Sequence, residues 1–277
     1  MGRPIGLPSI SWNAARSTAR QGSRVTDANV SDLQDALARG DHDRVLRLTD
    51  AILAERPGDD AAHELRARAL LALGRLDEAE LHAGDAVRLD PDEIRYRELL
   101  AEILSRRGAH RDAAAEFGRL ARNDPRQSAW DLAEARERLG AAQPEMSVEA
   151  ARRAVKLDPR GPEAQLALSR ALARIGDGRG AVQAATLAVE LLPGDPAAAE
   201  ALADAWWLAD QDAAAFAAYR SLALELHGDD RRRVTQKART LYHQRAGAIG
   251  RALAGLGPLF GLAFRNGWIA VAQEGSP

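Results

Sequence analysis

The chain has 277 residues, of which 46% are hydrophobic and only 4% aromatic, so its apolar content is mostly alanine and leucine. That balance suits closely packed helices better than strands. The absence of cysteine excludes disulfides, thiolate metal sites and a cysteine nucleophile. The net charge of -2 is unevenly distributed, because residues 1–24 carry +4, residues 25–230 carry -13 and residues 231–277 carry +7. An acidic central part argues against nucleic-acid binding by that part.

Residues 1–24 combine proline, glycine, serine and arginine without hydrophobic periodicity, which predicts a flexible basic N-terminal tail. Their acid-free composition is also typical of an organellar transit peptide, and a translation start at Val25 is a third interpretation. Two lysines beside 36 arginines, with much alanine, instead indicate a GC-rich bacterial genome. We therefore expect a bacterial, cytoplasmic protein.

Five prolines recur at one constant spacing through the central part of the chain: Pro57, Pro91, Pro125, Pro159 and Pro193. A proline cannot continue a helix, and it pushes the residue before it out of the α region. Glycines recur with the same period, at Gly40, Gly74, Gly108 and Gly176, where a left-handed residue can end a helix. A period of about 34 residues predicts a solenoid of repeated helix–turn–helix units.

Small residues share this period. They recur on the first helix of each unit as Ala67, Ala101, Ala135, Ser169 and Ala203, and on the second helix as Ala79, Ala113, Ala181 and Ala215. Small side chains allow antiparallel helices to approach closely. The third unit shows the full pattern of small, apolar, aromatic and proline positions, with Leu100-Ala101, Leu104, Ala113, Phe117 and Pro125. In this pattern the chain resembles the tetratricopeptide repeat (TPR) family.

The resemblance implies an all-α fold, a right-handed α-solenoid of about six TPR repeats over residues 25–229. Two repeats depart from the pattern. The first has the larger Leu33, Val45 and Ile52 at the small positions, as an edge repeat would. The fourth has Ala142 where the turn glycine is expected, which predicts a shortened first helix, a longer loop and a second helix that begins near Pro144.

TPR arrays typically present their first helices along a concave groove that holds a peptide or a partner helix. The resemblance therefore implies a non-catalytic interaction scaffold whose partner is a protein or peptide. Side chains at the groove-facing phase, or at its edge, are Arg68, Glu98, Glu102, Arg106, Arg136, Arg170, Arg174 and Trp207. The arginines can receive an acidic segment through bidentate pairs, or they can neutralise the glutamates beside them. Trp207 can anchor a partner or contact the C-terminal segment.

Residues 230–277 lack the small-residue pattern and predict a divergent segment, a basic helix followed by an apolar, glycine-rich stretch. Three interpretations stay open: a cap on the last repeat, a peripheral membrane tether, or a docking surface for a partner or a second copy. The residues that would form the tether or dock are Arg231, Arg232, Arg233, Leu256, Phe260, Phe264 and Trp268. The alternative function is thus a membrane-peripheral assembly factor. The sequence does not fix an oligomeric state.

No motif for catalysis or cofactor binding is recognisable. His63-Glu64 begins a metalloprotease pattern, but Ala67 stands where its second histidine would be. The six histidines are scattered along the chain, so we expect packing or surface roles for them and no metal site. The sequence therefore predicts neither an enzyme nor a cofactor.

Overall fold

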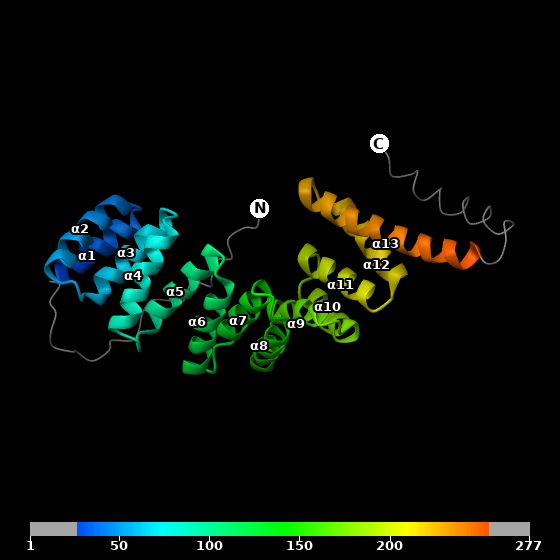
Figure 1. Ribbon diagram of the computed structural model, residues 1–277, viewed down its shortest axis with the longest axis horizontal. Helices are drawn as coiled ribbons and strands as arrows, with labels where there is room; N and C mark the ends of the chain where they lie inside the picture. The colour runs from blue at the N-terminus through cyan, green and yellow to red at the C-terminus, as the bar shows by residue number, and fades with distance from the viewer. Residues whose placement is uncertain (1–26, 255–277) are drawn as a thin grey trace.

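The computed structural model describes the backbone of residues 27–254 and the side chains of residues 32–244. Within that range the chain forms thirteen helices and no strand (Figure 1). The helices are α1 (Asp27–Ala38), α2 (His42–Glu55), α3 (Asp60–Ala72), α4 (Leu76–Leu89), α5 (Ile94–Arg107), α6 (His110–Asn123), α7 (Ser128–Gly140), α8 (Pro144–Leu157), α9 (Pro162–Arg174), α10 (Gly178–Leu191), α11 (Pro196–Leu208), α12 (Asp212–Glu225) and α13 (Gly228–Ala254).

The helix boundaries follow the period of the prolines. The second helices begin, at that same constant spacing, at His42, Leu76, His110, Pro144, Gly178 and Asp212. Helices α2, α4, α6, α8 and α10 each end two residues before one of the five periodic prolines. The interpretation of these prolines as helix stops is confirmed, because each one follows the residue that caps the helix.

The helices stack as successive antiparallel pairs. Each helix packs against its neighbours in the chain, and first helices also touch across repeats, α3 with α5, α7 with α9 and α9 with α11. Contacts between first helices thus join α3 with α5, and α7 with α9 and α11, while the helix pairs follow one another along the array (Figure 1). This arrangement confirms the predicted all-α solenoid of TPR repeats.

The seam between paired helices is built from the small residues that the sequence repeats. Ala67, Ala101 and Ala113, for example, have no exposed surface. Where serine takes such a position, its hydroxyl donates to a carbonyl of the facing helix: Ser147 to Ala135 at 2.7 Å, and Ser169 to Ala181 at 3.0 Å. The buried hydroxyls are thus satisfied without widening the seam.

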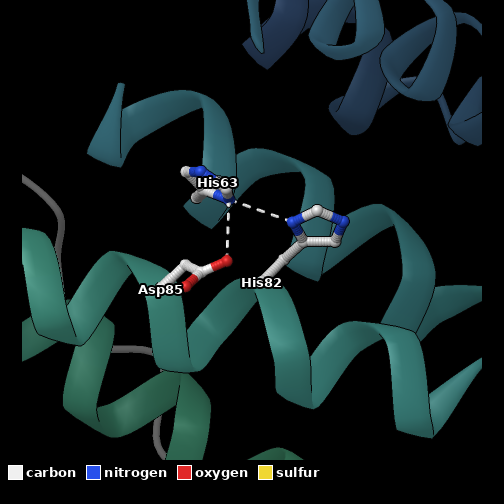
Figure 2. A group of neighbouring side chains, drawn as sticks. All are labelled: His63, His82 and Asp85. Carbon is white, nitrogen blue, oxygen red and sulfur yellow. Dashed lines mark hydrogen bonds and ion pairs between the residues drawn. The ribbon is translucent and has the colours of Figure 1, made fainter. Parts of the chain in front are cut away.

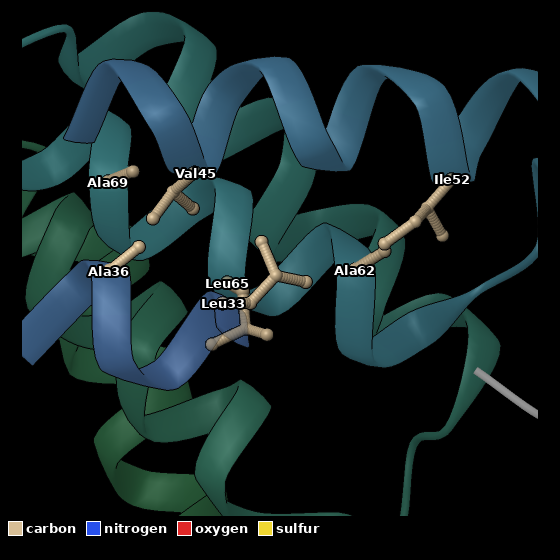
Figure 3. Close-up of a cluster of buried hydrophobic side chains, with 7 residues drawn as sticks. All are labelled: Leu33, Ala36, Val45, Ile52, Ala62, Leu65 and Ala69. Carbon is tan, nitrogen blue, oxygen red and sulfur yellow. The ribbon is translucent and has the colours of Figure 1, made fainter. Parts of the chain in front are cut away.

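The first repeat closes the N-terminal end of the array with larger side chains. Figure 3 shows the cluster, in which Leu33, Val45 and Ile52 pack with alanines of neighbouring helices. Leu33 and Val45 are 1% and 0% exposed. The facing small residues are Ala36, Ala62 and Ala69. Compared with the other repeats, this interface has large side chains where they have small ones and small side chains where they have large ones. The packing therefore remains dense.

The fourth repeat contradicts part of the sequence prediction. Helix α7 has 13 residues, like α3 and α9, and three residues connect it to α8. The expected shortened helix and longer loop are therefore wrong, although α8 does begin at Pro144. Ala142 adopts the left-handed conformation (φ 55°) that Gly74 adopts at φ 73° in its own turn. Packing of the helix pair imposes this backbone on a residue that disfavours it.

We expect Ala142→Gly to raise the free energy of unfolding by about 0.5–1 kcal/mol, because glycine adopts positive φ without steric cost. The reverse change at the equivalent turn, Gly74→Ala (φ 73° in the native turn), should lower that free energy by about 1 kcal/mol. Thermal and urea unfolding of both variants would measure the effects. A stabilised Gly74→Ala or a destabilised Ala142→Gly would contradict the argument.

Helix α13 covers the last repeat. Two residues, Leu226 and His227, separate it from α12, whereas four residues separate the second and first helices of the preceding repeats. Its Val234 and Leu241 are buried against Tyr219 and Leu222 of α12. The described part of the C-terminal segment therefore packs on the last repeat, as the capping interpretation requires, and the role of the segment stays a prediction. The apolar stretch that follows it lies outside the described residues.

Candidate interaction surface

The eight predicted groove residues all lie on first helices. Arg68 is on α3, Glu98, Glu102 and Arg106 are on α5, Arg136 is on α7, Arg170 and Arg174 are on α9, and Trp207 is on α11. Because first helices touch across repeats, these side chains occupy one layer of the array. We call the exposed side of this layer the first-helix surface. Its role in binding remains a prediction.

In the N-terminal half of this surface the arginines pair with glutamates of their own helices. Arg68 contacts Glu64, and Arg106 Nη2 lies 2.7 Å from Glu102 Oε1. Both pairs are spaced i, i+4, where helix side chains meet. Glu98 is half-buried, and burial raises its pKa, although the charge of Arg68 opposes this. This half of the surface therefore balances its own charge.

The C-terminal half is different. Among the side chains that the structure describes, no carboxylate forms an ion pair with Arg136, Arg170 or Arg174. Burial and the nearby Arg170 lower the pKa of Arg136, while Glu163 and Glu137 favour its charge. Arg170 and Arg174 are exposed. The result is a group of three cations without a countercharge in direct contact.

Two of these cations, Arg170 and Arg174, border a hollow of about 520 Å³ between α7, α9, α11 and α13. Its lining residues are Leu139, Ser169, Arg170, Ala173, Arg174, Ala197, Glu200, Ala201, Asp204 and Arg233. Alanines and one leucine form an apolar floor, and charged groups stand around it. We refer to this cavity as the C-terminal hollow.

Helix α13 is fastened to the same hollow by ion pairs. Arg233 Nη2 lies 2.7 Å from Glu200 Oε2, and Lys237 Nζ lies 2.9 Å from Glu200 Oε1 and 2.6 Å from Asp204 Oδ1. The Tyr219 hydroxyl donates to Asp204. Burial alone would raise the pKa of Glu200, but hydrogen bonds from Arg233 and Lys237 outweigh it and lower that pKa. Glu200 and Asp204 of α11 therefore form their ion pairs with Arg233 and Lys237 of α13.

Trp207 packs toward the cap. Its ring meets the Tyr219 ring edge-on, with centroids 6.3 Å apart, and it borders the cluster that contains Val234 and Leu241. The side chain is half-buried. The two predicted roles of Trp207, as an anchor for a partner and as a contact of the C-terminal segment, stay predictions.

The predicted C-terminal docking residues fall into two groups. Arg231, Arg232 and Arg233 are exposed on the first turns of α13, where Arg232 pairs with Asp229 and Arg233 pairs with Glu200 and Asp230. Leu256, Phe260, Phe264 and Trp268 lie outside the described residues, so the membrane role stays a prediction. Within residues 27–254, no helix combines the length and apolar character needed to cross a membrane.

Comparison with known proteins identifies the fold. Sequence models described as tetratricopeptide repeat match residues 36–103 and 132–196. No curated protein matches the chain. These two matched segments support a protein of the tetratricopeptide repeat superfamily.

Solved structures with the same fold include a tetratricopeptide repeat protein from Parabacteroides merdae ATCC 43184, which is 14% identical with a TM-score of 0.65 over 85% of this chain and 94% of its own. YrrB, described as a TPR protein with an unusual peptide-binding site, is 15% identical with a TM-score of 0.55 over 72% and 97%. MamA from Desulfovibrio magneticus RS-1 is 21% identical with a TM-score of 0.54 over 59% and 93%. At these identities the likeness concerns the fold.

We expect Glu200→Gln to weaken the docking of α13 and to cost about 1 kcal/mol at neutral pH, because Arg233 and Lys237 lose an anionic partner that is partly exposed. The pKa of Glu200 is lowered in the folded state, so its contribution is present at neutral pH and is lost as the pH falls through that lowered pKa.

Hydrogen exchange of α13 and thermal unfolding would measure this loss. The difference from the unmodified protein should narrow as the pH falls through the lowered folded-state pKa of Glu200, because the carboxyl then becomes protonated in both states. Glu190→Gln, at an exposed position on α10, is the matched control. Equal exchange of α13 in both variants at neutral pH would contradict the assignment.

Proposed function

We propose that this protein is a non-catalytic interaction scaffold that holds a carboxylate-bearing segment of a partner protein along its first-helix surface. The observation that carries the proposal is the set of three arginines, Arg136, Arg170 and Arg174, of which Arg170 and Arg174 line the C-terminal hollow. A cation that has no ion-pair partner within the described chain can accept a carboxylate without breaking an existing pair. Arginine adds bidentate geometry, which favours carboxylates over a general negative charge.

Charge balance supports this location over the N-terminal half. Arg68 and Arg106 are compensated by Glu64 and Glu102, so an acidic ligand there would have to displace an internal carboxylate. At the hollow, the ligand meets Arg170 and Arg174 directly, and the apolar floor contributes contact area. A basic ligand would meet repulsion from these arginines, which favours an acidic partner.

The test uses defined peptides and the full chain. We expect a fluorescently labelled, glutamate-rich peptide to bind, and the double change Arg170→Glu with Arg174→Glu to weaken its binding at least about 10-fold, because two bidentate contacts are lost and replaced by repulsion. Fluorescence anisotropy over a salt series would measure the affinities. A lysine-rich peptide of equal length should not bind the unmodified chain at the hollow.

The matched control is Arg152→Glu with Arg179→Glu. These arginines are exposed on the second helices α8 and α10, and the pair of changes alters the net charge equally. An equal loss of affinity in both double variants would show that only net charge matters. Unchanged binding by the first-helix variant would place the ligand elsewhere.

A further inference from the structure

Three side chains that are distant from the hollow meet between α3 and α4. His63 comes from α3, and His82 and Asp85 come from α4 (Figure 2). His63 Nδ1 lies 2.9 Å from His82 Nδ1 and 3.9 Å from Asp85 Oδ2. One ligand atom from each of the three residues lies within 4.8 Å of the others. His63 is buried and the other two are half-buried, so the group is open to solvent on one side.

The orientation of His63 has a cause that recurs along the array. Its Nε2 lies 3.1 Å from the carbonyl oxygen of Pro57, six residues earlier. Arg97 and Gln165, one and three repeats later, donate to Pro91 and Pro159 in the same way, each at 3.1 Å. A carbonyl only accepts, so Nε2 carries the hydrogen and the Nδ1 lone pair points toward His82 and Asp85. Histidine ligands of metals are typically oriented by such a bond.

The equivalent positions of the next two repeats are filled by ion pairs. One repeat further along the chain, the three side chains are Arg97, Glu116 and Arg119, in which both arginines contact Glu116. Two repeats further, they are Asp131, Ala150 and Arg153, with Arg153 Nε 2.7 Å from Asp131 Oδ1. In both of these repeats, the carboxylate at one of the three equivalent positions forms an ion pair with an arginine at another of the three positions. In the second repeat the same three positions hold His63, His82 and Asp85, whose nitrogen and oxygen atoms can each donate a lone pair to a metal ion.

We propose that His63, His82 and Asp85 form a binding site for a divalent transition-metal ion of the zinc class. Two imidazole nitrogens and one carboxylate oxygen are ligands that zinc accepts, and a water molecule would complete four-coordination. The two Nδ1 atoms are 2.9 Å apart and would move to about 3.3 Å as adjacent ligands of a tetrahedral ion at metal–nitrogen distances near 2.0–2.1 Å. Asp85 Oδ1 is held by Arg88 at 3.1 Å, which leaves Oδ2 for the metal.

Arg66 limits the affinity of this site. Its Nε donates to His82 Nε2 at 2.9 Å, so the hydrogen of the neutral His82 ring lies on Nδ1, where it is shared with His63. A metal at Nδ1 displaces that hydrogen to Nε2, which then faces the N–H of Arg66. Arg66 keeps its contacts with Asp50 and the Leu46 carbonyl. Arg66→Gln should therefore tighten binding, because the amide oxygen can accept from Nε2–H.

The test is a zinc titration of the full chain, without an affinity tag, against a chromophoric competing chelator. We expect one zinc ion per chain, at least about 10-fold weaker binding in His82→Gln and in Asp85→Asn, and about 10-fold tighter binding in Arg66→Gln. His110→Gln is the control, because His110 Nδ1 also meets a carboxylate, Glu137, at 2.8 Å but lacks a second histidine. Circular dichroism verifies that each variant is folded.

Folded His82→Gln and Asp85→Asn variants with unchanged zinc affinity would overturn the proposal, as would saturation that is lost only in His110→Gln. Failure of the unmodified chain to bind one equivalent would also overturn it, and so would weaker binding in folded Arg66→Gln. Cobalt(II) provides an independent readout, since its visible absorption reports tetrahedral coordination by nitrogen and oxygen. None of these outcomes depends on peptide binding at the C-terminal hollow, which lies on other repeats.

Discussion

The structure depends on the close approach of paired helices, which requires a small side chain at fixed positions of every repeat. Ala101 and Ala113 are completely buried, and Ser147 and Ser169 fit the same positions only because their hydroxyls bond to carbonyls across the seam. This constraint fixes the rotation of each helix about its axis. It thereby decides which side chains lie in the core, which face solvent on the first-helix surface, and which meet their counterparts one repeat away.

Because the constraint is periodic, the sequence predicts the array well. The prolines and small residues locate all six repeats and the starts of their second helices. The fourth repeat shows where local preference misleads: Ala142 disfavours a left-handed backbone, yet it adopts φ 55° because the flanking helices are packed in register. Asp210 does the same at φ 58° in the sixth repeat. Tertiary packing outweighs the small conformational cost at a single turn residue.

The candidate sites were less predictable, for reasons that particular residues make clear. The sequence suggests that the arginines of the first-helix surface act as one group. Among the described side chains, the structure separates them into paired arginines in the N-terminal half and unpaired arginines in the C-terminal half. Arg68 and Arg106 follow a glutamate four residues earlier, while Arg136 and Arg170 follow Leu132 and Leu166. That difference was readable in the sequence once helix spacing was considered. The His63–His82 contact required the repeat phase, since 19 residues separate the two rings and only alignment with Arg97–Glu116 shows that the positions face each other.

The cap and the C-terminal hollow form one structural unit. In a solenoid each repeat contacts only its neighbours, so the last repeat needs α13 to cover Tyr219 and Leu222. Arg233 and Lys237 achieve this by pairing with Glu200 and Asp204, and Arg233 then becomes part of the lining of the hollow. The proposed ligand would first meet Arg170 and Arg174, which are unpaired within the described chain, and Arg233, which is shared with Glu200, stands beside them. Binding of that ligand would therefore be coupled to the docking of α13 only as far as it draws Arg233 away from Glu200.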